Sequence, residues 1–128
     1  MIAVDALSKS FTTDRGTVEV LKGISLDINA GARIAIVGSS GAGKTTFVSL
    51  LSGRLPVQAG RITLSGRDIT RLPAHKRKFG MVFQSFALFP HYSVRENVAY
   101  SLTIGGMGKS EAFAKANTLL DTVQLGGF

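Results

Sequence analysis

The sequence contains no cysteine among its 128 residues. This absence excludes a disulfide framework and a thiolate metal site, and it fits a reducing compartment. No window approaches the roughly 20 apolar residues that a bilayer-spanning helix needs. Asp5 lies where a signal peptide would require an apolar run. We therefore expect a soluble, cytoplasmic chain that does not insert into a membrane by itself.

Acidic residues are outnumbered by basic ones, and the formal net charge is +7. Nucleic acid, anionic lipid or a phosphate ligand could balance such a charge. The densest basic run is His75-Lys76-Arg77-Lys78, and aromatic residues are not interleaved with it as a strand-stacking platform would need. We therefore expect no nucleic-acid partner, and we interpret the run as a solvated surface turn.

Strands are predicted in two groups. Short β-favouring runs at 2–4, 17–21, 24–28 and 61–64, with a turn at Ser65-Gly66, indicate antiparallel strands with one covered face. Continuous apolar runs at 34–37 and 80–83 are typical of strands buried on both faces. Since hydrophobic residues make up 45% of the chain, a packed core is expected.

Helices are predicted in three places. Residues 44–52 form an apolar-faced segment that Gly53 can terminate, with Phe47, Val48, Leu50 and Leu51 on its buried side. Ser93 and Glu96 have the spacing of a capping box, which predicts a helix to about Thr103. After the break at residues 105–108, Ser110 can cap a further helix, whose buried stripe would be Phe113, Ala116, Leu119, Leu120 and Val123.

One motif carries specific chemistry: the eight residues 38–45 match G-x-x-x-x-G-K-[ST] completely. Glycines allow successive backbone N–H groups to converge on a phosphate, and the helix that follows adds its positive N-terminal end. Lys44 supplies charge to the β- and γ-phosphates, and the Thr45 hydroxyl can ligate Mg²⁺. The predicted nucleotide-binding residues of this loop are Gly38, Ser39, Ser40, Gly41, Ala42, Gly43, Lys44, Thr45 and Thr46.

A flexible Gly/Ser linker would explain the glycines but not Lys44-Thr45 after an apolar run. The loop alone leaves the base open between ATP and GTP. The sequence shows neither the Asp-x-x-Gly nor the Asn-Lys-x-Asp pattern of GTPases, which speaks against GTP. His75 and His91 have no acidic or metal-ligating neighbour in sequence, so we interpret both as structural or surface residues.

The segments around the loop resemble ATP-binding subunits of ABC transporters. The resemblance rests on residues 7–11 and 20–26, on the loop itself, and on residues 80–98 with Gln84 at their glutamine-loop position. It is strongest with importers of polyamines, iron, sulfate or sugars. It implies an α/β fold of the P-loop NTPase type, with an antiparallel β subdomain (about 1–30 and 60–70), a P-loop core (31–55 and 79–84) and the start of a helical subdomain (85–128).

The resemblance also implies roles for single residues. Phe11 stands where the family places an aromatic ring against adenine, and Val18 where a further apolar contact to the base is expected. Lys44 and Gln84 would serve catalysis, with Gln84 contacting Mg²⁺ or the attacking water. The implied cofactors are ATP and Mg²⁺. Phe11 could instead pack in a core, and Gln84 could be a plain surface residue at the end of a strand.

The resemblance implies partners and a position in the cell. Permease subunits and a second ATP-binding subunit would hold the protein on the inner face of the membrane. The family's signature loop, Mg²⁺-binding Asp, catalytic Glu and switch His have no counterpart here, and residues 125–128 only mimic the signature. We therefore expect a truncated domain that binds nucleotide without hydrolysing it. A soluble ABC-type ATPase without a membrane partner is the alternative.

Overall fold

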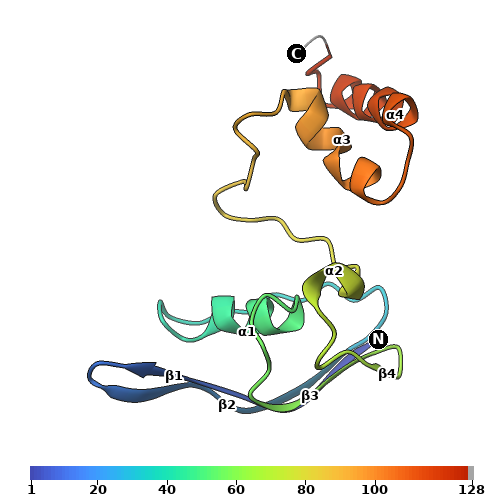
Figure 1. Cartoon of the computed structure of the whole chain (residues 1–128). Coiled ribbons are helices and arrows are strands. Elements are labelled where there is room, and N and C mark those ends of the chain that lie inside the picture. The colour runs from blue at the N-terminus through green and yellow to red at the C-terminus, as the bar shows by residue number, and fades with distance from the viewer. Residues whose placement is uncertain (127–128) are drawn as a thin grey trace. The chain divides into compact units, whose positions relative to one another are not determined.

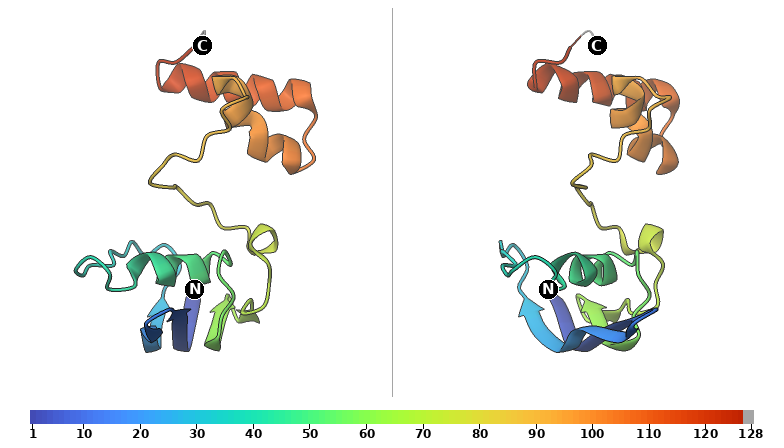
Figure 2. Two further views of the ribbon diagram at one scale, coloured as in Figure 1. Left: turned by 60° about the vertical axis from the view of Figure 1, so that its left-hand side comes forward. Right: turned by 90° about the vertical axis from the view of Figure 1, so that its left-hand side faces the viewer.

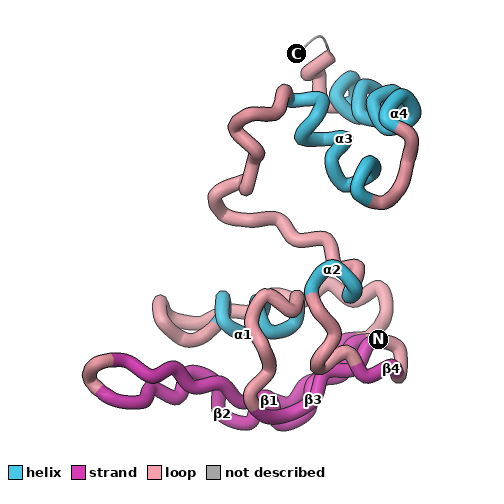
Figure 3. The backbone as a smooth tube through the Cα atoms, viewed as in Figure 1, coloured by secondary structure: helices cyan, strands magenta, loops and turns pink. Residues whose placement is uncertain are grey.

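The computed structural model describes residues 1–126, which divide after Met81 into two compact units (Figure 1). The first holds all the strands labelled in Figure 3, together with α1 (Lys44–Leu51) and α2 (Ala74–Arg77). The second holds α3 (Val94–Ile104) and α4 (Lys109–Thr122). No helix among the described residues is long and apolar enough to cross a membrane.

The first unit is built on an antiparallel sheet. Its strands β1 (Ile2–Thr13), β2 (Gly16–Ile28), β3 (Ala59–Leu64) and β4 (Arg67–Asp68) lie in the order β2-β1-β3-β4. The predicted antiparallel strands are confirmed, although the runs at 17–21 and 24–28 belong to one continuous strand. The turn at Ser65-Gly66 is also confirmed, with φ values of 49° and 80° that suit a tight hairpin.

Helix α1 covers one face of this sheet, as two further views show (Figure 2). Phe47 and Leu50 from the helix pack with Leu7 and Ile62 from the sheet in one apolar core. The predicted helix is confirmed, and Gly53 follows its C-cap with φ 77°. Val48 is 37% exposed, so its placement on the buried side was wrong.

The two strands predicted at 34–37 and 80–83 do not form in the described structure. Both segments have no regular secondary structure and no ladder pairing, and Val37 and Val82 are 87% and 96% exposed. A strand exists only where neighbouring backbone groups accept and donate its hydrogen bonds. Apolar character alone therefore predicted a burial that these residues lack.

The interpretation of residues 75–78 as a solvated turn was wrong for one residue. His75, Lys76 and Lys78 are exposed, as predicted, but Arg77 is only 4% exposed. Its guanidinium donates hydrogen bonds to backbone carbonyl oxygens of four residues, which replace the water that burial removes. Burial lowers the pKa of Arg77 from its ordinary value.

The second unit pairs α3 with α4 over a small core of Ala99, Ala112 and Ala116. The capping box of α3 is confirmed, with Ser93 Oγ accepting from the Glu96 backbone N–H and the Glu96 carboxylate accepting from Ser93. Ser110 is not a cap, because the helix begins one residue earlier with Gly108 at the N-cap. Ala116 and Leu120 are buried as predicted, whereas Leu119 and Val123 are 57% and 62% exposed.

Candidate phosphate-binding site

The backbone of residues 38–43 folds back on itself just before α1, and residues 44 and 45 open the helix. Gly38, Gly41 and Gly43 have φ values of 156°, 80° and 86°, a region that residues with a Cβ rarely enter. A Cβ on Gly43 would meet the Val20 and Leu21 side chains at 3.0 Å. Gly43 is therefore required twice, by its conformation and by its close approach to β2.

Lys44, the first residue of α1, turns its ammonium back onto the loop. Nζ donates to the carbonyl oxygens of Gly38 at 2.8 Å and Ser39 at 2.7 Å. An ammonium carries three N–H donors, so this arrangement fixes the charge at the loop and leaves it donor capacity for a ligand. The backbone N–H of Ala42 also donates to Ser39, across the Ser39–Ala42 turn.

The N-terminal end of α1 points its backbone at the same loop. Its first turn carries no acidic residue, and the Gly43 N-cap provides no side-chain acceptor for the first N–H groups. Unshared N–H groups at a helix start attract anions. In the same turn Thr45 is exposed and Thr46 is half-buried. The loop thus offers backbone donors, an ammonium and a hydroxyl.

A bulge in β2 explains how the sheet meets the loop. Lys9 pairs with Leu21 and Ser10 with Glu19, so Val20 is the extra residue. A bulge of this kind re-aims neighbouring side chains. It turns both Val20 and Leu21 toward Gly43. The sequence carried no signal for this register shift, because it depends on pairing with β1.

Phe11 and Val18 are direct partners across β1 and β2 near the hairpin end. Phe11 is 36% exposed and Val18 52% exposed, so neither is a core residue. The Lys9 ammonium lies 5.4 Å from the centre of the Phe11 ring. The structure therefore brings the two predicted base-contacting residues together on an accessible part of the hairpin.

Gln84 belongs to the second unit, where it begins the turn that follows Phe83. Its side chain is exposed. Phe86 and Ala87 in this turn have left-handed backbone angles, φ 60° and 51°, and Phe86 is 79% exposed. Of the two histidines, His75 is exposed and His91 packs edge-on against Tyr92 with ring centres 4.4 Å apart.

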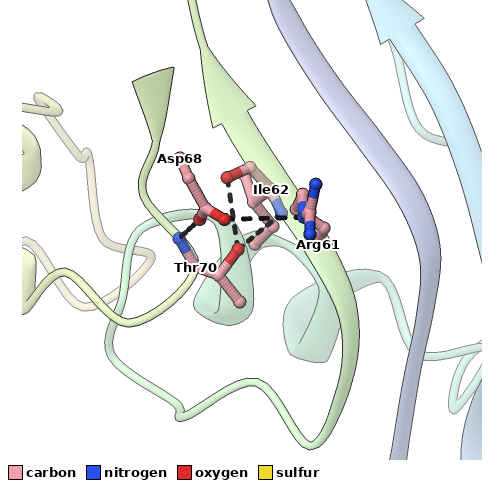
Figure 4. A network of polar contacts seen from close by, with 4 residues as sticks. All are labelled: Arg61, Ile62, Asp68 and Thr70. Carbon is pink, nitrogen blue, oxygen red and sulfur yellow. Dashed lines mark hydrogen bonds and ion pairs between the residues drawn. The ribbon is translucent and has the colours of Figure 1, made fainter. Parts of the chain in front are cut away.

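A polar network at the β3–β4 hairpin was not predicted (Figure 4). The Thr70 hydroxyl accepts from the Ile62 backbone N–H at 3.0 Å, and the Thr70 backbone N–H donates to Asp68 at 2.8 Å. Asp68 also pairs with Arg61 at 3.5 Å. Hydrogen bonding by the Thr70 side chain, and then by its backbone N–H, lowers the pKa of Asp68. The network fixes Thr70 against the sheet.

The comparisons with known proteins assign this loop to a family. The family model described as ABC transporter matches residues 21–128. The chain belongs to the ABC transporter family. Its fold is that of the matching part of an ATP-binding cassette.

Curated relatives of this ABC-type chain include importer subunits. The Fe(3+) ions import ATP-binding protein FbpC of Brucella abortus is 44% identical over 119 residues, which are 93% of this chain and 34% of that protein. The sulfate/thiosulfate import ATP-binding protein CysA of Thermosynechococcus vestitus is 38% identical over 126 residues, 98% of this chain and 36% of that protein. The chain thus spans about a third of the length of these relatives.

Solved structures confirm the cassette fold. A dimeric, post-hydrolysis state of the ATP-binding cassette MJ0796 bound to ADP and Pi matches with a TM-score of 0.84 and 25% identity. The match covers 97% of this chain and 57% of that cassette. The predicted fold class of the ABC-type chain is therefore confirmed, and the family implies nucleotide binding.

Proposed function

We propose that this chain binds Mg·ATP through residues 38–45 and belongs to the energy-coupling subunit of an ABC importer. The observation that carries the proposal is the convergence of three donors on one loop. These are the glycine-shaped backbone, the N-terminal end of α1 and the Lys44 ammonium held at Gly38 and Ser39. Charge-assisted donors arranged this way suit a polyphosphate.

Each loop residue has a distinct part in this proposal. Backbone N–H groups of the loop and of Thr45 and Thr46 would donate hydrogen bonds to phosphate oxygens. The Lys44 ammonium would replace a hydrogen bond to a loop carbonyl with one to the β- and γ-phosphates. The Thr45 hydroxyl would ligate Mg²⁺, which neutralises phosphate charge when it is bound. The proposed binding of phosphate and Mg²⁺ therefore requires the side chains of Lys44 and Thr45.

Phe11 and Val18 are the proposed contacts to the base. A half-exposed ring beside an apolar residue offers a flat face on which adenine can stack. We expect Phe11→Ala to weaken ATP binding by about 10-fold, because base–aromatic stacking contributes ~1–3 kcal/mol. Phe11→Tyr, which keeps the face, should bind as the wild type does. Competition of ATP and GTP for a fluorescent analogue would test the base preference.

Hydrolysis needs a positioned water and a base besides charge neutralisation. Lys44, Thr45 and Gln84 supply only part of that set, so we propose that the 128-residue chain binds nucleotide without turnover. The contact of Gln84 with Mg²⁺ or with the attacking water remains a prediction from the family resemblance. An ATPase activity that Lys44→Ala abolishes would contradict the absence of turnover.

The importer assignment rests on the relatives, which are ATP-binding proteins of Fe(3+) import and of sulfate/thiosulfate import. By analogy, the partners would be permease subunits and a second ATP-binding subunit, with the protein peripheral on the cytoplasmic face of the membrane. The exposed aromatic turn after Gln84 favours a docked partner over the alternative, a soluble ABC-type ATPase.

The test is a titration with a fluorescent ATP analogue and Mg²⁺. Lys44→Ala should weaken binding about 10- to 100-fold, because a hydrogen bond to a charged group contributes ~1.5–3 kcal/mol. Lys22→Ala is the matched control, since it removes one exposed lysine that pairs with Glu19 on β2. Equal binding by wild type and Lys44→Ala would contradict the proposed function.

A further inference from the structure

Arg77 is a buried cation whose hydrogen bonds all lead to the main chain. Two of the accepting carbonyls belong to Leu50 and Leu51, at 2.9 and 2.8 Å from Nη1. These residues end α1, where the last carbonyls of a helix lack intrahelical donors. A cation at this end also complements the helix dipole. Arg77 therefore terminates the same helix whose first turn follows the phosphate-binding loop.

The other half of the guanidinium is anchored to the segment after β4. Nε donates to the Leu72 carbonyl at 2.7 Å and Nη2 to the Thr70 carbonyl at 3.0 Å. Thr70 is in turn fixed to Ile62 of β3 (Figure 4). A planar fork with five N–H donors on three nitrogens can bond all four carbonyls at once, whereas an ammonium, with three donors on one nitrogen, cannot. The C-terminal end of α1 is thereby tied to the sheet.

The opposite end of α1 meets the sheet at Gly43, against Val20 and Leu21. Helix α1 has 8 residues, so it is about 12 Å long and too short to absorb a displacement by bending. A shift of its C-terminal end would reach the loop that precedes it. A misplacement of about 1 Å in a positioned group can cost up to ~100-fold in function.

We propose that Arg77 is a positioning residue for the phosphate site: by clamping the C-terminal end of α1 to Thr70 and Leu72, it sets where Lys44 and the loop amides lie. The inference rests on the proposed function, because it concerns the same loop. In this role Arg77 contacts no nucleotide and acts only through α1.

The first measurement is the affinity for a fluorescent ATP analogue with Mg²⁺ in Arg77→Met, Arg77→Lys and the control Lys76→Met. Lys76 is an exposed cation on the same short helix, so its removal changes the charge without touching the clamp. Arg77→Met should raise the dissociation constant about 10-fold or more, and Arg77→Lys should rescue it only partly. Lys76→Met should stay within about 2-fold of the wild type, as exposed charges do.

The titration also separates positioning from a purely structural role. A residue that only stabilises the fold would raise the apparent dissociation constant only in proportion to the lost folded fraction, which the far-UV circular dichroism signal reports. Positioning raises the dissociation constant by more than the lost folded fraction explains. If Arg77→Met does not fold, Arg77→Lys keeps the test, because it retains a cation of similar length. Wild-type affinity in a folded Arg77→Lys would then overturn the proposal.

Amide hydrogen exchange without nucleotide distinguishes this proposal from the proposed function. In Arg77→Lys the amides of Phe47 and Ser52, which donate to Gly43 and Val48, should exchange faster than in the wild type. Unchanged exchange in α1 would overturn the role of Arg77 even if the chain binds ATP. If α1 exchanges faster in Arg77→Lys but the wild-type chain binds no ATP, the proposed function is overturned, and the positioning role with it.

Discussion

In the first unit a sheet and α1 bury large branched and aromatic side chains, whereas in the second unit α3 and α4 meet over alanines. Leu7, Leu50 and Ile62 are fully buried in the first core, and Ala99, Ala112 and Ala116 in the second. Large interlocking side chains hold a helix in one position, because dense packing resists displacement. Small residues allow close approach of two helices but bury little apolar area.

Both units expose some large apolar side chains, and Val37 of the first unit is 87% exposed. In the second unit Phe86 is 79% exposed, Leu88 68% and Ile104 72%. Exposed large apolar side chains of this kind suit a partner-covered surface. The core of large side chains thus lies in the unit of the proposed phosphate site, and Phe86 in the second unit belongs to the proposed docking surface.

The largest expected effect concerns the first core. Leu50→Ala should lower the free energy of unfolding by about 2–5 kcal/mol, through lost burial and the cavity left behind. The control is Val48→Ala, in the same helix but 37% exposed, which should change it by about 0.5 kcal/mol or less. Urea unfolding followed by circular dichroism measures both. Equal losses from the two variants would show that α1 is not held by its buried face.

The second core should lose stability when a buried side chain is made larger rather than smaller. Ala116→Leu should cost about 1–3 kcal/mol, because the contact between α3 and α4 has no room for the added atoms. Ala114→Leu places the same side chain on the exposed face of α4 and is the control. Hydrogen exchange in α3 and α4 should accelerate only in Ala116→Leu. If Ala116→Leu is as stable as the wild type, the second core is not closely packed over its alanines.

A smaller effect is expected at the start of α3. Ser93→Ala removes the acceptor of the Glu96 backbone N–H and should cost about 1 kcal/mol. Ser101→Ala, at an exposed position of the same helix, should change little. Thermal unfolding of the two variants gives the comparison. An unchanged unfolding temperature in Ser93→Ala would mean that packing on α4, rather than the cap, stabilises α3.

The capping box also predicts a pH dependence. The backbone N–H of Ser93, and then its hydroxyl, lower the pKa of Glu96. A carboxyl whose folded pKa is lowered stabilises the fold above its unfolded pKa of about 4.3, and this contribution is lost as the pH falls through the folded value. The stability gap between wild type and Glu96→Gln should therefore narrow below about pH 4. A constant gap from pH 7 to pH 3 would contradict a charged Glu96 cap.

Features set by local sequence were predicted well. The turn of the phosphate loop, the helix after it and the capping box of α3 each depend on residues within a few positions of one another. Phe11 and Val18 were named from the family resemblance, and the β1–β2 register makes them neighbours. Their contact with a base, like the roles of Lys44, Thr45 and Gln84, remains a proposal.

Features set by distant contacts were missed. Residues 34–37 have the apolar character of a buried strand, but a strand also needs a paired neighbour. The burial of Arg77 depends on carbonyls 26 and 27 positions earlier in the chain, at Leu51 and Leu50. The bulge at Val20 depends on the pairing of β2 with β1. None of these relations leaves a periodic trace in the sequence.

The loop at residues 38–45 is the proposed binding site for polyphosphate. Backbone amide NMR of the chain, titrated with Mg·ATP and in parallel with MgSO₄, tests it directly. We expect Mg·ATP to shift the amide resonances of Gly41, Gly43, Lys44 and Thr45 first and most strongly, and Lys44→Ala to reduce these shifts. Shifts confined to other basic segments, such as residues 75–78, with the loop unchanged, would contradict it.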